Sequence, residues 1–169
     1  MESILVYALG FLAQGLFSAR ILVQWILSER AKKVVSPTIF WILSLIASYL
    51  LFIYGWLRDD FSIMLGQVIA YYVYIWNLGA KGAWKSIRSG WRQILVTILL
   101  LTPVVGISLM ADHAQDLIAR LFENSEIPLW LILFGSLGQV IFSFRFIYQL
   151  IYSSRRGESM LPAGFWIIS

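Results

Sequence analysis

The sequence has 169 residues, of which 60% are apolar, 16% are aromatic and only 13% are charged. A water-soluble domain of this length needs more charged residues to cover its surface, so the composition excludes an ordinary soluble globular protein. The formal net charge is +4. The absence of cysteine excludes disulfides, thiolate catalysis and cysteine-ligated metals. The composition is typical of an integral membrane protein.

Apolar residues gather in blocks that are long enough to cross a bilayer, which takes roughly 20 residues per helix. Five such blocks occupy residues 3–28, 37–57, 61–79, 93–111 and 128–153, and a sixth begins near Pro162. The fold class that we predict is therefore all-α, a polytopic membrane helical bundle.

Basic residues are concentrated in the segments 29–36, 80–92 and 154–161, which share one side of the membrane if the spans alternate. These segments carry nine lysines and arginines: Arg30, Lys32, Lys33, Lys81, Lys85, Arg88, Arg92, Arg155 and Arg156. On the opposite side, Arg58 and Arg120 stand among acidic residues. The positive-inside rule places the basic segments in the cytoplasm and the N-terminus outside.

The sequence also contains an internal repeat. Residues 10–44 align without a gap with residues 135–169 when the chain is shifted by 125 positions, and fifteen of the thirty-five pairs are identical. Many of the identical residues are polar, proline or tryptophan, so shared apolarity does not explain the match. Both copies start on the same side of the membrane, which makes the repeats parallel.

The span at 93–111 lies between the two copies, which predicts a 3+1+3 plan with an incomplete second repeat. The predicted domains are a first three-helix repeat over 1–79 and a partial second repeat over 128–169. Between them, 80–127 provides a basic cytoplasmic segment, the linker helix and an outer loop. Within that loop, residues 112–127 have the pattern of a short amphipathic helix on the membrane surface.

Each copy places an arginine inside an apolar span with a glutamine four residues later, Arg20 with Gln24 and Arg145 with Gln149. Such polar groups avoid lipid, because each unpaired one costs several kcal/mol in hydrocarbon. Two arginines related by the repeat suit the clamping of a phosphate or a carboxylate. Two alternatives remain open for Arg20, namely snorkelling toward the cytoplasm and pairing with an acid such as Glu29.

Further polar residues lie in the first, third and fifth spans. Gln14 and Gln139 precede the two arginines at equivalent positions of the repeat. In the third span, Gln67, Tyr71 and Tyr74 share one helical face and Asn77 follows; these residues either line a cavity wall or form helix–helix hydrogen bonds. At the start of the second span, Ser36-Pro37 predicts a serine N-cap followed by a proline in the first turn.

No residue pattern points to a catalytic, metal, cofactor or nucleic-acid site. His113 stands alone in a polar loop, and Asp59-Asp60 forms a short turn without an acid–base or metal-ligating partner nearby. We therefore expect no catalytic residues, no cofactor, no metal and no nucleic-acid partner.

Several of these motifs together are similar to the lipid A biosynthesis N-terminal domain family, which is related to the PQ-loop and SWEET superfamily of three-helix-repeat transporters. The similarity covers 10–79 and, as a partial second copy, 135–169. Trp76 departs from the family pattern, which has an arginine there. The motifs are Gly10, Gln14, Phe17, Arg20, Gln24-Trp25, Ser28-Glu29, Ser36-Pro37, Phe40-Trp41, Ser44, Gly66-Gln67, Tyr74 and Asn77-Leu78.

The resemblance and the paired arginines together suggest a transporter or flippase-like protein of the bacterial inner membrane. Its substrate would be an anionic lipid-linked envelope intermediate of the lipid A or polyprenyl-phosphate type. Arg20 and Arg145 would meet the phosphate. The predicted ligands of the sugar and phosphate oxygens are Gln14, Gln24, Gln139 and Gln149, and the predicted wall is Gln67, Tyr71 and Asn77.

Two other functions are compatible with the sequence. One is a non-transporting membrane scaffold that recruits an envelope glycosyltransferase. The other is an enzyme of lipid A assembly, which would need a catalytic group that the sequence does not reveal. The expected partners are a membrane lipid or lipid-linked sugar phosphate, a glycosyltransferase and further copies of the chain.

Overall fold

The computed structural model describes residues 2–58, 61–123 and 129–168, and within these ranges every regular element is a helix. The all-helical fold class is therefore confirmed. The helices are α1 (Glu2–Ala31), α2 (Thr38–Leu57), α3 (Phe61–Ala80), the short 3₁₀ helix η1 (Ala83–Ser86), α4 (Ser89–Glu123), α5 (Leu129–Arg156) and α6 (Ala163–Ile168).

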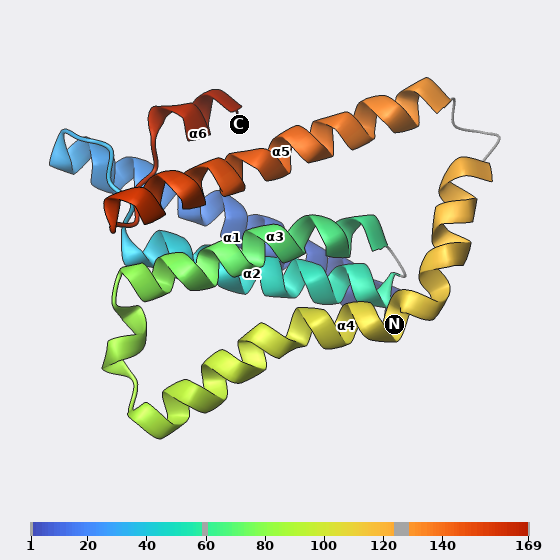
Figure 1. The fold of residues 1–169 in the computed structure, drawn as a ribbon, viewed down its shortest axis with the longest axis horizontal. Helices are drawn as coiled ribbons and strands as arrows, with labels where there is room; N and C mark the ends of the chain where they lie inside the picture. The colour runs from blue at the N-terminus through green and yellow to red at the C-terminus, as the bar shows by residue number, and fades with distance from the viewer. Residues whose placement is uncertain (1, 59–60, 124–128, 169) are drawn as a thin grey trace.

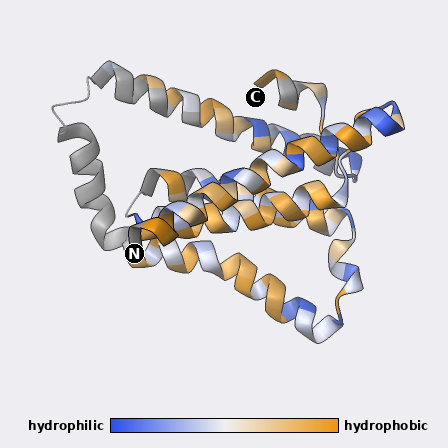
Figure 2. Ribbon diagram, turned by 180° about the vertical axis from the view of Figure 1, so that it is seen from behind, coloured by the Kyte–Doolittle hydropathy of each residue, from blue (hydrophilic) through white to orange (hydrophobic). Residues whose placement is uncertain are grey.

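Three helical segments are long and apolar enough to cross a membrane, namely Ile4–Ala31, Thr38–Leu57 and Ser89–Leu109. Figure 2 shows apolar residues along most of these segments, with hydrophilic residues gathered toward one end of the molecule. Many apolar side chains of α4 are exposed, among them Trp91 at 68% and Leu109 at 61%. Such a surface is stable only where lipid or protein replaces water.

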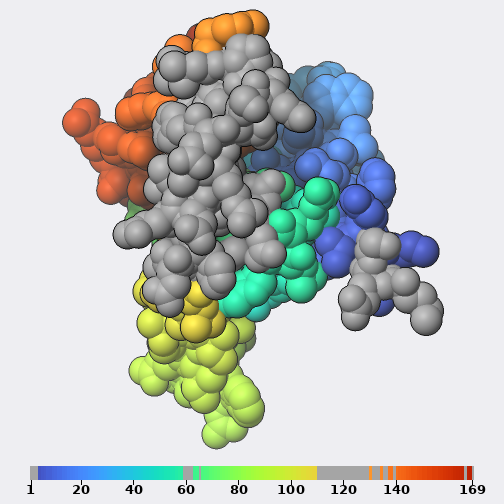
Figure 3. Space-filling view, turned by 90° about the vertical axis from the view of Figure 1, so that its right-hand side faces the viewer, coloured from blue at the N-terminus to red at the C-terminus, as the bar shows by residue number. Residues whose placement is uncertain are grey.

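Helices α1, α2 and α3 form a bundle in which α1 packs on α2 and α2 packs on α3. Helix α5 packs on α3 and carries α6, while α4 begins away from the bundle and approaches it along its length (Figures 1 and 3). The core is rich in aromatic rings, and Trp41, Tyr71 and Tyr74 are almost fully buried. Phe146 of α5 and Phe165 of α6 join the same cluster, so the core extends across both repeats.

Helices α1, α3 and α5 run in the same direction, whereas α2 runs in the opposite one (Figure 1). As a consequence, the connections α1–α2, α3–α4 and α5–α6 lie at the same end of the molecule. These are the connections that carry the basic segments. We call this end the basic end.

The two copies of the repeat end their first helix in the same way. The Lys33 amide donates to the Ser28 carbonyl at 3.3 Å, and the Glu158 amide donates to the Ser153 carbonyl at 3.2 Å. The residue before each amide is left-handed, with φ of 53° at Lys32 and 67° in the second copy, where glycine occupies the position. Both helix ends are Schellman caps, so the two sequence copies share this backbone conformation where the first helix of each ends.

Two local predictions are wrong. Ser36 does not cap the second span, because α2 begins at Thr38 with Pro37 at the N-cap and without a side-chain cap. Instead, Ser36 Oγ donates to the Ser159 carbonyl at 2.7 Å and thereby joins the two copies. The predicted linker span and the predicted surface helix at 112–127 are not separate elements, because α4 continues without a break to Glu123. The stretch 107–119 contains neither glycine nor proline, so nothing local stops the helix there.

Candidate functional site

Arg20 points into the bundle rather than toward the surface. Its side chain is buried at 8% exposure, and Nη1 donates to Ser44 Oγ at 2.8 Å and to Tyr74 Oη at 2.9 Å. These bonds tie α1 to α2 and α3. Snorkelling is therefore not observed. Nor is a pairing with Glu29, whose carboxylate instead contacts the exposed Lys32 at 3.1 Å.

Arg145, the equivalent residue of α5, is also buried, at 7% exposure, but its environment is aromatic. Its guanidinium carbon lies 3.6 Å from the ring centre of Phe142, 4.7 Å from that of Phe146 and 5.4 Å from that of Phe165. No hydrogen bond joins this guanidinium to the described part of the chain, and its Nε is buried without a partner. Within the described structure, the Arg145 charge is therefore stabilised by cation–π attraction to these three rings.

The two arginines occupy matching aromatic surroundings. Arg20 lies over Phe17 and Phe40 at 4.6 and 5.2 Å, and these rings are the repeat equivalents of Phe142 and Phe165. Between the two arginines, the rings of Tyr74 and Phe146 meet edge to face with centres 5.5 Å apart. Arg145 is near enough to interact electrostatically with both Tyr74 and Arg20. We call Arg20, Tyr74 and Arg145 the arginine cluster.

The arginine cluster has no acidic counterpart. Among the side chains that the structure describes, the one ion pair joins Lys32 to Glu29 on the surface. A buried cation without an anion is expensive, by several kcal/mol, and two neighbouring cations also repel each other. The cluster is therefore an uncompensated positive site near the basic end of the bundle.

A second set of polar groups connects α3 with α5 and the α5–α6 connection. The amides of Asn77 and Gln149 bond reciprocally, at 3.1 and 2.9 Å, and both side chains are fully buried. Ser159 Oγ donates to Asn77 Oδ1 at 2.7 Å, and Gln149 Nε2 lies 2.9 Å from Ser153 Oγ and 2.8 Å from the Met160 carbonyl. These five residues form what we call the amide network.

Gln24 holds the corresponding connection of the first copy. Its Nε2 lies 3.3 Å from Ser28 Oγ and 3.2 Å from the Val35 carbonyl, the positions equivalent to Ser153 and Met160. The same glutamine–serine pair therefore fastens the returning chain in both copies. A ligand at either glutamine would compete with these internal bonds.

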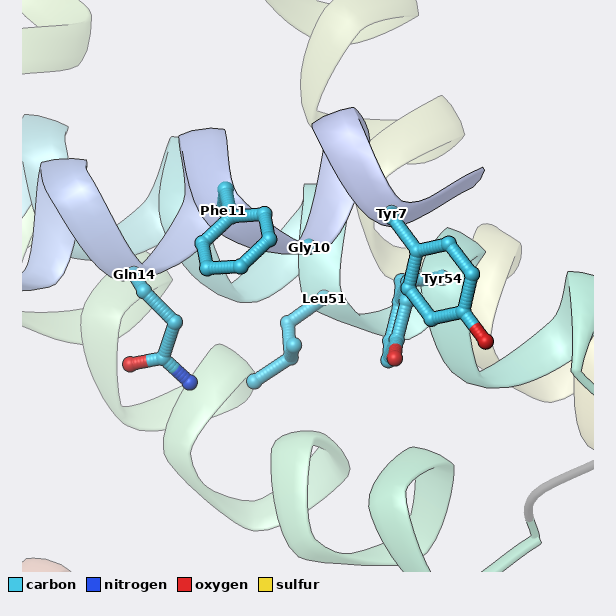
Figure 4. Close-up of a pocket in the computed structure, with 6 residues that line it drawn as sticks. All are labelled: Tyr7, Gly10, Phe11, Gln14, Leu51 and Tyr54. Atoms are coloured by element: carbon cyan, nitrogen blue, oxygen red, sulfur yellow. The ribbon is translucent and has the colours of Figure 1, made fainter. Parts of the chain in front are cut away.

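Three further predicted site residues, Gln14, Gln67 and Tyr71, make no hydrogen bond with the arginine cluster. Gln14 is exposed and lines a hollow of about 170 Å³ together with Tyr7, Gly10, Phe11, Leu51 and Tyr54 (Figure 4). Gln67 Oε1 accepts a hydrogen bond from Ser48 Oγ at 3.0 Å. The Tyr71 hydroxyl is buried without a partner. The side chain of Gln139 lies outside the described residues.

Tyr74 and Ser44, the two residues that anchor Arg20, were among the polar residues noted in the sequence but were not part of the predicted ligand set. Tyr74 shares a helical face with Gln67 and Tyr71, but the sequence does not show which of the two tyrosines faces the arginines. Ser44 has an identical counterpart in the repeat, Ser169, which lies outside the described residues. That identity was the available signal, because a polar residue retained in both copies of an apolar span is informative.

At the basic end, Lys81 follows α3 and interacts with Glu158 of the α5–α6 connection. Partial burial lowers the pKa of Lys81, and the Glu158 carboxylate acts in the opposite direction. The three basic segments carry nine lysines and arginines against two glutamates, Glu29 and Glu158. Positive charge is therefore in excess at this end, which suits a surface that faces anionic lipid.

Comparison with known proteins identifies the family. The family described as Lipid A Biosynthesis N-terminal domain matches residues 9–79 and 134–169. The chain belongs to this family. The matched ranges include both arginines and the complete amide network.

Curated relatives give the family match an enzymatic context. The chain is 31% identical to the lipid-A-disaccharide synthase of Chlamydia felis over 168 residues, covering 96% of this chain and 27% of the relative. The corresponding enzymes of Chlamydia pneumoniae and Chlamydia caviae are 31% and 30% identical, with similar coverage. The chain thus spans about a quarter of the length of these relatives. No solved structure matches it.

These findings overturn the predicted transport function. The homologous proteins are named as synthases of the lipid A disaccharide, and the family is that of an N-terminal domain of lipid A biosynthesis. A transporter or flippase-like protein for a lipid-linked intermediate is therefore the wrong interpretation. The relation to PQ-loop and SWEET transporters likewise finds no support. The paired arginines suggested transport because intramembrane charges often mark a pathway, but they mark binding sites as well.

Proposed function

We propose that the chain acts in lipid A disaccharide synthesis, as the membrane domain of a synthase of the lipid A disaccharide. The observation that carries this proposal is the alignment of 96% of the chain with the Chlamydia felis synthase at 31% identity. The family match supports it, since it spans most of the bundle. The relatives are about four times as long as this chain. The activity of the complete enzyme is therefore assigned here by similarity and is part of the proposal.

In this proposal, the chain spans the bacterial inner membrane several times, with its N-terminus outside and its basic end in the cytoplasm. Two observations support this arrangement. Three segments have the length and hydropathy of membrane spans, and the basic connections lie together at one end of the molecule. Cytoplasmic enrichment in lysine and arginine is the usual determinant of such an orientation.

The chain's own contribution is to hold the lipid during synthesis. A product that joins two sugars on acyl chains lies at the membrane surface, with its acyl chains among the helices and its polar head at their ends. The amide network, beside the α5–α6 connection, and the arginine cluster, about three helical turns further into the bundle than that connection, supply buried polar groups that such a head could bind.

A chimaera tests the proposal. The segment of the Chlamydia felis synthase that aligns with this chain is replaced by residues 1–169, and the chimaera is expressed in cells that lack their own synthase. Mass spectrometry of extracted lipids then measures the lipid-linked disaccharide. The matched control is the same enzyme with that segment deleted.

The proposal predicts that the chimaera forms the disaccharide and that the deletion forms much less. If the chimaera accumulates in the membrane at the level of the parent enzyme yet forms no more disaccharide than the deletion, the proposed role is wrong.

A further inference from the structure

The two buried arginines differ in their hydrogen bonds. Arg20 is anchored through Nη1 to Ser44 and Tyr74, whereas Arg145 donates no hydrogen bond within the described chain. The Nε of each arginine is buried without a partner, so the difference lies in the terminal nitrogens, which are bonded in Arg20 and make no hydrogen bond to the described residues in Arg145. A guanidinium has five N–H donors, and a buried one normally uses most of them.

Tyr74 offers another donor beside this guanidinium. Its hydroxyl oxygen accepts a hydrogen bond from Arg20 at 2.9 Å, which leaves its own proton for a further acceptor. The ring is held in place, since it is 1% exposed and packs against Trp41 and Phe146. Arg20 therefore positions Tyr74 and adds positive potential, while the N–H groups of Arg145 stay open to an acceptor.

We propose that the arginine cluster binds a phosphate group, with Arg145 and the Tyr74 hydroxyl as direct ligands and Arg20 as the residue that positions Tyr74. The site needs an anion, because the described chain places two cations here and no carboxylate. It also needs several acceptor atoms, because the unbonded donors come from two residues. A phosphate has three or more acceptor oxygens and pairs with arginine in bidentate geometry.

The aromatic rings around Arg145 fit this assignment. The rings of Phe142, Phe146 and Phe165 surround the guanidinium carbon and attract its charge, but they satisfy none of its N–H groups with an oxygen acceptor. A bidentate acceptor would bind those N–H groups. A methionine at position 145 would fill similar space without needing an anion, so the charge is retained at an energetic cost that a bound anion would offset.

The phosphate is carried by a lipid or is free in solution, and both sources present the same chemistry. That the lipid is a substrate of disaccharide synthesis rests on the proposed function, whereas the phosphate site itself rests on the arginine cluster alone. The two claims therefore fail in different experiments.

Binding is measured by calorimetric titration of the full chain in uncharged maltoside micelles. The titrants are dodecyl phosphate, inorganic phosphate and dodecanoate. The test variant is Arg145→Met, and the matched control is Arg155→Met, which removes the same charge from an exposed position ten residues further along α5. A second variant, Tyr74→Phe, deletes one hydroxyl and keeps the buried ring.

We expect Arg145→Met to weaken dodecyl phosphate binding by about tenfold or more, since charge-assisted bonds contribute that much. Tyr74→Phe should weaken it by about threefold to tenfold, as the loss of one hydrogen bond does. Arg155→Met should bind within about twofold of wild type. Without ligand, Arg145→Met should unfold at the same temperature as wild type or higher, because it removes an unpaired buried charge.

The titrants separate the sources of the phosphate. Arg145-dependent binding of dodecyl phosphate alone identifies a lipid head group, and Arg145-dependent binding of both phosphates identifies free phosphate; either result supports the site. Dodecanoate binding as tight as that of dodecyl phosphate would overturn the assignment to phosphate. Equal affinity of wild type, Arg145→Met and Tyr74→Phe would overturn the site. If phosphate binding depends on Arg145 but the chimaera forms no disaccharide, the phosphate site is supported and the proposed role in synthesis is refuted.

Discussion

The amide network gives a quantitative prediction, because the repeat supplies an internal comparison. Gln149 and Gln24 are equivalent by sequence, yet only Gln149 bonds to another helix, through its reciprocal pair with Asn77. Replacing either glutamine with leucine keeps the volume and removes the amide. The structure predicts that Gln149→Leu is clearly more destabilising than Gln24→Leu.

The magnitude follows from the bonds that are lost. The Gln149 Nε2 lies within hydrogen-bond distance of three acceptors but has two protons, so it donates two bonds at a time. Its Oε1 accepts one more, from Asn77 at 3.1 Å, which gives about three simultaneous hydrogen bonds. Its partners keep other bonds, since Asn77 still binds Ser159 and the Val73 carbonyl. At about 0.6 to 1 kcal/mol per bond, Gln149→Leu should lower the free energy of unfolding by about 2 to 3 kcal/mol.

Gln24 has less to lose, because its two bonds are long, at 3.3 and 3.2 Å. Gln24→Leu should therefore cost about 1 kcal/mol or less. Both values come from equilibrium unfolding of the purified chain in mixed micelles at increasing denaturing detergent. A double-mutant cycle of Gln149→Leu with Asn77→Leu should show a coupling of about 1 kcal/mol. Equal costs for the two glutamines, together with no coupling to Asn77, would refute the described network.

Three further predictions concern positions outside these clusters. Gly106→Ala should lower the thermal midpoint, since an added Cβ would lie 2.7 Å from a ring carbon of α2, whereas Gly138→Ala meets no atom within 4 Å and should be neutral or stabilising. Lys32→Gly should stabilise the chain by about 0.5 to 1 kcal/mol in detergent unfolding, because φ is 53° there and the repeat equivalent is glycine. Lys81 has a lowered pKa, so the unfolded chain binds its proton more tightly. Stability should therefore rise with pH just below 10.5, and this slope in the thermal midpoint should be smaller in Lys81→Met.

Much of the fold could be predicted from the sequence because membrane helices are specified locally. Length and hydropathy locate each helix without knowledge of its neighbours, and the basic segments identify the connections that share one end. The end of α4 was missed because the stretch after residue 111 becomes polar without containing a residue that breaks a helix. Polarity ends a membrane span, but it does not end a helix.

The candidate site was predictable only in part. The repeat singled out Arg20 and Arg145, and it paired Gln24 with Gln149. It did not reveal that Asn77 bonds to Gln149 or that Tyr74 bonds to Arg20, because those contacts depend on how α3 packs against α2 and α5. Gln14 shares a helix with Arg20 but is exposed on another face. Position along a helix is evident from the sequence, whereas the register between helices is a property of the packed bundle.

The central claim is that this chain serves lipid A disaccharide synthesis, and the most direct test is made in the cells that encode it. The gene is deleted and then restored as wild type, and extracted lipids are quantified by mass spectrometry for the lipid-linked monosaccharide and the disaccharide. We predict that deletion raises the ratio of monosaccharide to disaccharide and that the wild-type gene restores it. An unchanged ratio after complete loss of the protein would contradict the account.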